Sequence, residues 1–74
     1  MTAVATKRQP TPREAEVLGH LVAGRTTAEV AVLLGVSPAT VHGHLRTARE
    51  RLAIDTRAEL LAWAHRHHHE LPGG

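Results

Sequence analysis

Residues 26–52 read TTAEVAVLLGVSPATVHGHLRTARERL and contain two helix-forming stretches with a very short connection between them. Thr26 followed by Glu29 is a capping box, in which each side chain bonds the backbone N–H of the other residue at the start of a helix. Gly35 is the residue type that most often ends a helix in the left-handed conformation. The Ser-Pro pair at 37–38 supplies a capping oxygen and a proline for the first turn of a second helix. We therefore predict one helix before Gly35 and a second over about 38–52.

The connection between these two helices consists only of residues 35–37. Such a short connection makes the helices cross steeply, and crossing helices need a small residue where their backbones approach each other. Ala31, four residues before Gly35, is that small residue, and Val36 and Val41 are expected to fill the junction from the other side. The pattern is that of a helix-turn-helix, whose second helix is free to enter the major groove of DNA.

Two further helices flank this motif and are marked in the same way. The segments TPRE at 11–14 and TRAE at 56–59 repeat the Thr-x-x-Glu capping box. Apolar residues recur at helical spacing after each start, and no segment shows the two-residue alternation of a strand. We therefore expect an all-α, four-helix domain without strands. The predicted boundaries are a flexible arm at 1–10, the helix-turn-helix domain at 11–66 and a frayed, His-rich tail at 67–74.

Composition narrows the class of protein. The 74 residues are 42% hydrophobic and 22% charged, and nine basic residues, eight of them Arg, accompany seven carboxylates. A chain this short lacks room for the deep pocket of an enzyme, so we expect no catalysis and no cofactor. It has no cysteine, and no apolar run approaches the roughly 20 residues that span a membrane. We expect a soluble, cytoplasmic protein.

The polar side of the helix at 38–52 indicates a partner. An apolar stripe that is expected to be buried consists of Val41, Leu45, Ala48 and Leu52. The other side chains are mostly donors suited to phosphates or guanine edges, and Arg46, Arg49 and Arg51 lie within six residues. Positive charge clustered directly after a helix-turn-helix junction predicts double-stranded DNA as the partner.

Several short segments together form a specific pattern: PRE at 12–14, EVA at 29–31, LGVSPATV at 34–41, HL at 44–45, RL at 51–52 and RAEL at 57–60. In this combination they resemble the LuxR/GerE-type domain, a four-helix helix-turn-helix at the C-terminus of many bacterial regulators. The resemblance covers residues 11 to about 65. It implies a transcriptional regulator that acts in the bacterial nucleoid, as a homodimer, with RNA polymerase as a further candidate partner.

The resemblance also implies roles for individual residues. The base-reading positions are His42, Gly43 and Arg46. The phosphate-binding positions are Thr26, Thr27, Thr40, His44 and Arg49. The dimer contact is expected on the last helix, through Leu60, Leu61, Trp63 and Ala64. Arg46 is the leading candidate for sequence specificity because a guanidinium can bond guanine O6 and N7 together, and contact with phosphate alone is the alternative.

Three positions depart from the family pattern. His42 stands where the family usually has Lys or another long polar residue, and Gly43 stands where it usually has a side chain. Ala53 replaces the glycine that usually ends the recognition helix, so we expect a reshaped exit toward the last helix. For Trp63, a position in the core and a position in an interface remain equally open.

Other functions are less well supported by the sequence. His65, His67, His68 and His69 have spacings that suit metal ligands, but they lie at a helix end without any cysteine, so we predict no metal site. The helix at 38–52 also resembles the promoter-reading domain of an extracytoplasmic-function sigma factor, although residues 54–61 extend past the point where such domains end. A protein-interaction module that has lost DNA binding is the second alternative.

Overall fold

A computed structural model of the chain describes residues 9–72. Four α-helices follow one another: α1 (Pro12–Val22), α2 (Thr27–Leu34), α3 (Pro38–Leu52) and α4 (Arg57–Arg66). A short 3-10 helix, η2 (His68–Glu70), comes after α4. Within the described residues there is no strand, so the predicted all-α, four-helix fold is confirmed. None of the helices in that range has the length and apolar character needed to cross a membrane.

The helices begin at the predicted caps, which are Thr11, Thr26, Ser37 and Thr56. Both halves of the capping box are present at α1 and α2. At α4 only one half forms, because Glu59 N–H donates to Thr56 Oγ1 at 3.1 Å while the Glu59 carboxylate accepts from the Thr56 hydroxyl instead of its backbone. The third predicted capping box is therefore incomplete.

Two helices end in the left-handed conformation. Gly35 has φ 69° after α2, as predicted for the turn of the helix-turn-helix. Ala53 has φ 57° after α3 and is, among the described residues, the one non-glycine residue with positive φ. Ala53 thus ends α3 in the left-handed conformation that a glycine adopts most readily. The side chain makes this conformation less favourable by about 1 kcal/mol.

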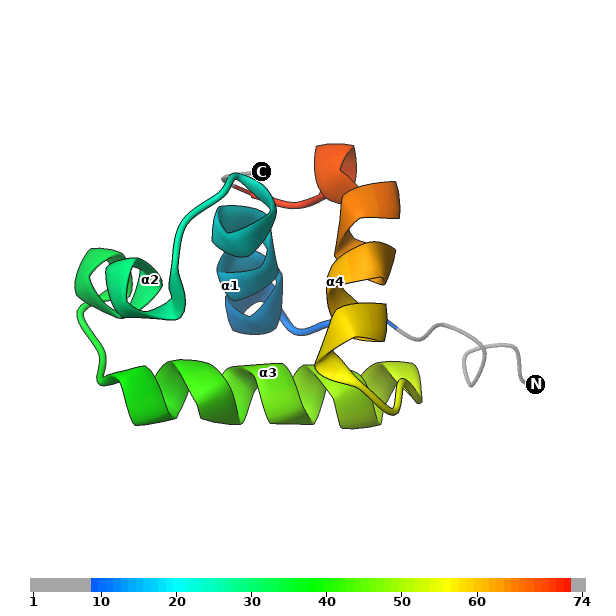
Figure 1. Cartoon of the computed structure of the whole chain (residues 1–74), viewed down its shortest axis with the longest axis horizontal. Coiled ribbons are helices and arrows are strands. Elements are labelled where there is room, and N and C mark those ends of the chain that lie inside the picture. The colour runs from blue at the N-terminus through cyan, green and yellow to red at the C-terminus, as the bar shows by residue number, and fades with distance from the viewer. Residues whose placement is uncertain (1–8, 73–74) are drawn as a thin grey trace.

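The core lies where α1 and α4 stand side by side on the same side of α3 (Figure 1). α2 packs across the N-terminal part of α3 and contacts α1, which completes the domain. Ala31, the small residue predicted at the helix crossing, is 3% exposed. The buried apolar residues are Val17, Leu18, Val30, Ala31, Val41, Leu45, Ala48, Leu52, Leu60, Ala64 and Leu71. The opposite side of α3 carries no other element, and it runs along one edge of the domain (Figure 1).

The segment after α4 is more ordered than the sequence suggests. Of the tail predicted at 67–74, the structure describes residues 67–72, in which η2 turns the chain and Leu71 joins the core with 8% exposure. Leu71 therefore packs this segment against the rest of the domain. The arm predicted at 1–10 lies outside the described residues except for Gln9 and Pro10.

Candidate nucleic-acid interface

The free side of α3 presents three exposed side chains in a row. His42, Arg46 and Glu50 are four residues apart, so they lie one above another on one face of the helix. All three are exposed, and none makes a side-chain hydrogen bond or ion pair with residues 9–72. Gly43 lies next to this row and is partly exposed, with open space where a Cβ would stand. We call this surface the α3 free face.

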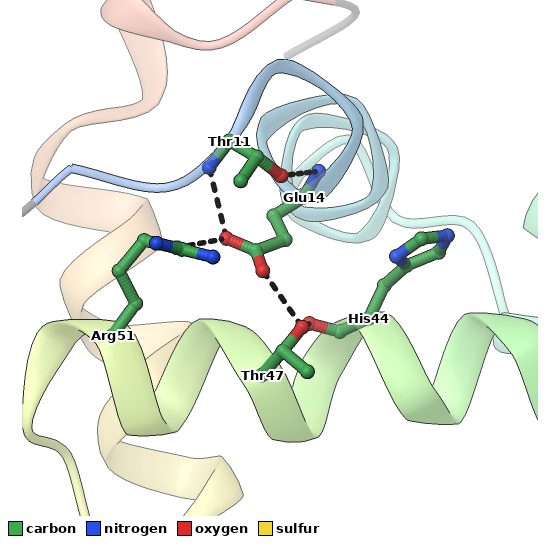
Figure 2. Close-up of polar contacts among 5 residues, drawn as sticks. All are labelled: Thr11, Glu14, His44, Thr47 and Arg51. Carbon is green, nitrogen blue, oxygen red and sulfur yellow. Dashed lines mark hydrogen bonds and ion pairs between the residues drawn. The ribbon is translucent and has the colours of Figure 1, made fainter.

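The side of α3 that faces α1 carries a different set of contacts, centred on Glu14 (Figure 2). Glu14 is 3% exposed and accepts three hydrogen bonds through its carboxylate. Thr47 Oγ1 donates to Oε2 at 2.7 Å, Arg51 Nε donates to Oε1 at 3.1 Å, and the backbone N–H of Thr11 donates to Oε1 at 2.9 Å. One buried carboxylate therefore joins the start of α1 to two turns of α3.

The ionisation of Glu14 follows from these contacts. Burial raises the pKa of the Glu14 carboxyl, but the hydrogen bonds from Thr47, Thr11 and Arg51, together with the positive charge of Arg51, lower it by more. The resulting pKa lies below the ordinary value of 4.5, so the carboxylate is charged at neutral pH. A charged acceptor strengthens each of the three hydrogen bonds.

This arrangement changes the interpretation of the basic cluster on α3. Thr47 and Arg51, which the sequence places among the outward-facing donors, turn toward α1 and bond Glu14. Arg49 is also engaged, because its Nη1 donates to the backbone oxygen of Asp55 at 2.8 Å in the α3–α4 connection. Of the three arginines, only Arg46 has a guanidinium without a partner among residues 9–72.

The remaining phosphate-binding candidates lie at the start of α2 and in the first half of α3. Thr26 caps α2, since its Oγ1 accepts from Glu29 N at 3.1 Å, and Thr27 in the first turn is half-buried. The hydroxyl of Thr40 lies 3.0 Å from that of Ser37 at the start of α3. His44 is half-buried on the α1 side of α3, next to the Glu14 contacts (Figure 2). The structure therefore brings the base-reading candidates onto one face of α3 and leaves the phosphate candidates at the start of α2 and at other positions on α3.

Comparison with known proteins identifies this architecture. A family model described as bacterial regulatory proteins, luxR family (GerE), matches residues 10–64, which contain all of the helix-turn-helix. The chain belongs to the luxR family. The resemblance predicted from the motifs is thereby confirmed, and residues 10–64 form a DNA-binding domain of a family of bacterial regulators, which are not enzymes in this part of the chain.

A curated relative agrees with this luxR-family membership. The transcriptional regulatory protein MctR of Rhizobium johnstonii is 43% identical over 54 residues, which are 73% of this chain and 25% of MctR. The chain thus spans about a quarter of the length of that relative. No solved structure matches the chain.

The complete α4 also answers the sigma-factor alternative. α4 packs against both α1 and α3 and supplies Leu60 and Ala64 to the core, as expected for a four-helix luxR domain. A domain that ended near α3 would leave this core open. The luxR assignment is therefore preferred over the sigma-like one.

The dimer candidates on α4 separate into two groups. Leu60 and Ala64 are 0% exposed, so their side chains stabilise the domain itself and are not available to a second copy. Leu61 and Trp63 are half-buried and keep part of their surface accessible. The Trp63 indole packs against the edge of the core and stacks on His67, with ring centroids 4.2 Å apart and planes 22° from parallel.

The His-rich segment forms local contacts. His67 Nδ1 lies 2.8 Å from the backbone oxygen of Trp63, and His68 and His69 meet edge to face with ring centroids 5.5 Å apart. Across the part of the chain that the structure describes, no three His, Cys, Asp or Glu side chains are grouped closely enough to hold a metal ion.

Sequence reasoning missed the Glu14 cluster. The motif TPRE marks Glu14 only as a capping residue, and nothing local relates it to Thr47 or Arg51, which are 33 and 37 positions away. The one signal in the sequence is that hydrogen-bond donors, Thr47 and Arg51, follow one side of α3 next to its apolar stripe, where a buried acceptor on another helix could bond them.

Proposed function

We propose that this luxR-family domain binds specific sites in double-stranded DNA by placing the α3 free face in the major groove. The observation that carries the proposal is the placement of Arg46, which is exposed, unpaired among the described residues, and set on the one side of α3 that no other helix covers. An α-helix fits the major groove of B-DNA, and its side chains can then reach the base edges.

Arg46 is proposed as the principal base-reading residue. Its guanidinium can donate to O6 and N7 of one guanine, a bidentate contact that contributes about 1–3 kcal/mol of discrimination against other bases. His42, one turn earlier, offers a single ring donor or acceptor, and Gly43 allows the backbone of α3 to approach the bases closely.

Phosphate contacts are proposed for residues at the start of α2 and on α3 outside the row of His42, Arg46 and Glu50. Thr26 and Thr27 stand at the start of α2, where the backbone N–H groups and the helix dipole also favour an anion. Thr40 and His44 border one side of α3 and Arg49 the other. These contacts would fix the position of the domain on DNA without selecting a sequence.

Homodimerisation through α4 is proposed with fewer contact residues than the sequence predicts. Leu61 and Trp63 keep accessible apolar surface on α4, whereas Leu60 and Ala64 are buried in the core and are excluded from the contact. Two residues offer little surface compared with the roughly 800 Å² per partner of a stable interface. We therefore propose a dimer that forms only on DNA, at sites made of two half-sites related by two-fold symmetry. From such sites the protein would regulate transcription in the cytoplasm, with RNA polymerase as a candidate partner.

The proposal is tested by selecting bound sequences from a pool of random duplexes and then measuring affinities for the selected site. We expect a motif that contains a guanine whose replacement weakens wild-type binding and has little effect on Arg46→Ala. Arg57→Ala, which removes an exposed arginine at the start of α4, is the matched control and should retain the full base preference. If no duplex is bound even at low salt, the protein-interaction module becomes the preferred function.

A further inference from the structure

α2 carries an exposed apolar surface that DNA binding does not explain. Val32 is 81% exposed and Leu33 is 56% exposed, and they are the large hydrophobic residues found exposed in the described part of the chain. Both line one shallow hollow together with Arg25 and Glu29. We call these four residues the α2 patch.

The α2 patch is a consequence of how α2 is packed. Its neighbours Val30 and Ala31 are buried against α3 and α1, so Val32 and Leu33 necessarily lie on the outer surface of the helix. Polar residues at these two positions would leave the fold unchanged, since neither side chain contributes to the core. Two adjacent exposed apolar residues that the fold does not need make this surface a candidate for contact with another molecule.

We propose that the α2 patch binds the α2 patch of a second copy of this chain on the same DNA, which makes binding to adjacent sites cooperative. The inference rests on the proposed DNA binding. Its first support is charge complementarity. The patch contains one cation, Arg25, and one anion, Glu29, beside the apolar pair. A two-fold contact brings the same surface of both copies together, so Arg25 of each copy can face Glu29 of the other.

The small size of the α2 patch explains why the contact needs DNA. Four residues per copy are far fewer than the roughly 20–30 residues that each side of a typical stable interface contributes. Free copies would therefore remain separate. Two copies bound next to each other on one duplex have a high effective concentration, at which a weak contact becomes populated.

The position of the α2 patch allows the α2 contact and the proposed α4 dimer contact to form at the same time. α2 and α4 lie at opposite ends of the domain with α1 between them (Figure 1). A pair joined through α4 would therefore leave both of its α2 patches free on the outside. The α2 contact would then link neighbouring pairs along the DNA.

The test compares binding to duplexes that carry one or two copies of the selected site, with the spacing varied in steps over about one helical turn (~10 base pairs). At a favourable spacing, we expect the second wild-type site to be occupied with about tenfold higher affinity than the single site. Val32→Glu and Val32→Lys should each remove this gain and retain single-site affinity, because like charges then face each other across the two-fold contact. An equimolar mixture of the two variants should recover part of the gain. Gln9→Glu and Gln9→Lys, at an exposed position before α1, are the charge-matched controls and should behave like wild type.

A cross-linking experiment gives an independent readout. The chain has no cysteine, so Val32→Cys places a single thiol in the α2 patch. With a short bismaleimide, we expect cross-linked pairs on the two-site duplex but not on the single-site duplex, whereas Gln9→Cys should give none on either. Independent occupation of the two sites at every spacing, with normal single-site affinity, would overturn the α2 contact and leave the DNA-binding proposal intact. Loss of binding to the single site by wild type would instead contradict the proposed function itself.

Discussion

Replacing Glu14 by alanine removes the one buried carboxylate that joins α1 to α3. The side chain accepts hydrogen bonds from Thr11, Thr47 and Arg51 and is 3% exposed. Hydrogen bonds to a charged group contribute about 1.5–3 kcal/mol each. The three contributions do not add fully, because Arg51 is 46% exposed and its guanidinium can bind water after the change. We expect Glu14→Ala to lower the free energy of unfolding by about 3 kcal/mol.

Thermal and chemical unfolding followed by circular dichroism measure this effect. In a domain of this size, a loss of about 3 kcal/mol corresponds to a decrease in Tm of roughly 15 °C. Glu14→Gln keeps the shape of the side chain but loses the charge and one acceptor, so we expect a smaller loss of about 1–2 kcal/mol. The matched control is Glu16→Ala on the same helix, which removes an exposed ion pair with Arg13 (3.1 Å) and should cost less than about 0.5 kcal/mol.

The pH dependence separates the charge of Glu14 from its shape. The pKa of Glu14 lies below 4.5 in the folded domain, so its stabilisation is fully present above pH 4.5 and is lost as the pH falls through the lower, folded-state pKa. The stability difference between wild type and Glu14→Gln should therefore be constant near neutral pH and shrink on acidification below 4.5. Equal stabilities for Glu14→Ala and Glu16→Ala, or a difference that does not depend on pH, would refute this reasoning.

Three further predictions concern α3. Gly43→Ala should raise the stability by about 1 kcal/mol, seen as a higher Tm, because a Cβ at this position meets no atom within 4 Å and alanine favours a helix. Ala53→Gly should also raise the stability measured by urea unfolding, by up to about 1 kcal/mol, because glycine adopts the φ of 57° without the strain that alanine has there. A loss of stability would show that the greater entropy of the unfolded glycine chain outweighs the relief of this strain. Arg49→Ala should reduce the slope of log affinity against log salt concentration by about 1, and an unchanged slope would remove Arg49 from the phosphate contacts.

The parts of the fold that could be predicted are those set by neighbouring residues. A cap involves residues three positions apart, and Gly35 ends α2 through its own backbone conformation, so both are visible in a short stretch of sequence. The buried stripe of α3 was predicted from its spacing and is confirmed by the burial of Val41, Leu45, Ala48 and Leu52. Ala53 shows the limit of this reasoning, because it ends α3 in a left-handed conformation that the residue type does not favour.

The parts that could not be predicted depend on what packs against a helix. Leu60 and Ala64 are apolar, as residues of a dimer contact would also be, and only the packing of α4 against α1 and α3 makes them core residues. From the sequence alone Arg51 resembles a DNA-binding residue, because its oppositely charged partner Glu14 comes close to it only in the folded domain. The same applies to Leu71, which is buried because the chain turns after α4.

The central claim is that the α3 free face lies in the major groove with Arg46 on a guanine, and methylation interference on the selected site tests it most directly. Methylation of guanine N7 blocks an acceptor in the major groove, whereas methylation of adenine N3 blocks one in the minor groove. We predict that wild-type binding is prevented by N7-methylguanine at a specific position of the selected site, and that Arg46→Ala no longer distinguishes the methylated from the unmethylated guanine at that position. Interference only from N3-methyladenine, or the same guanine interference for Arg46→Ala as for wild type, would contradict the account.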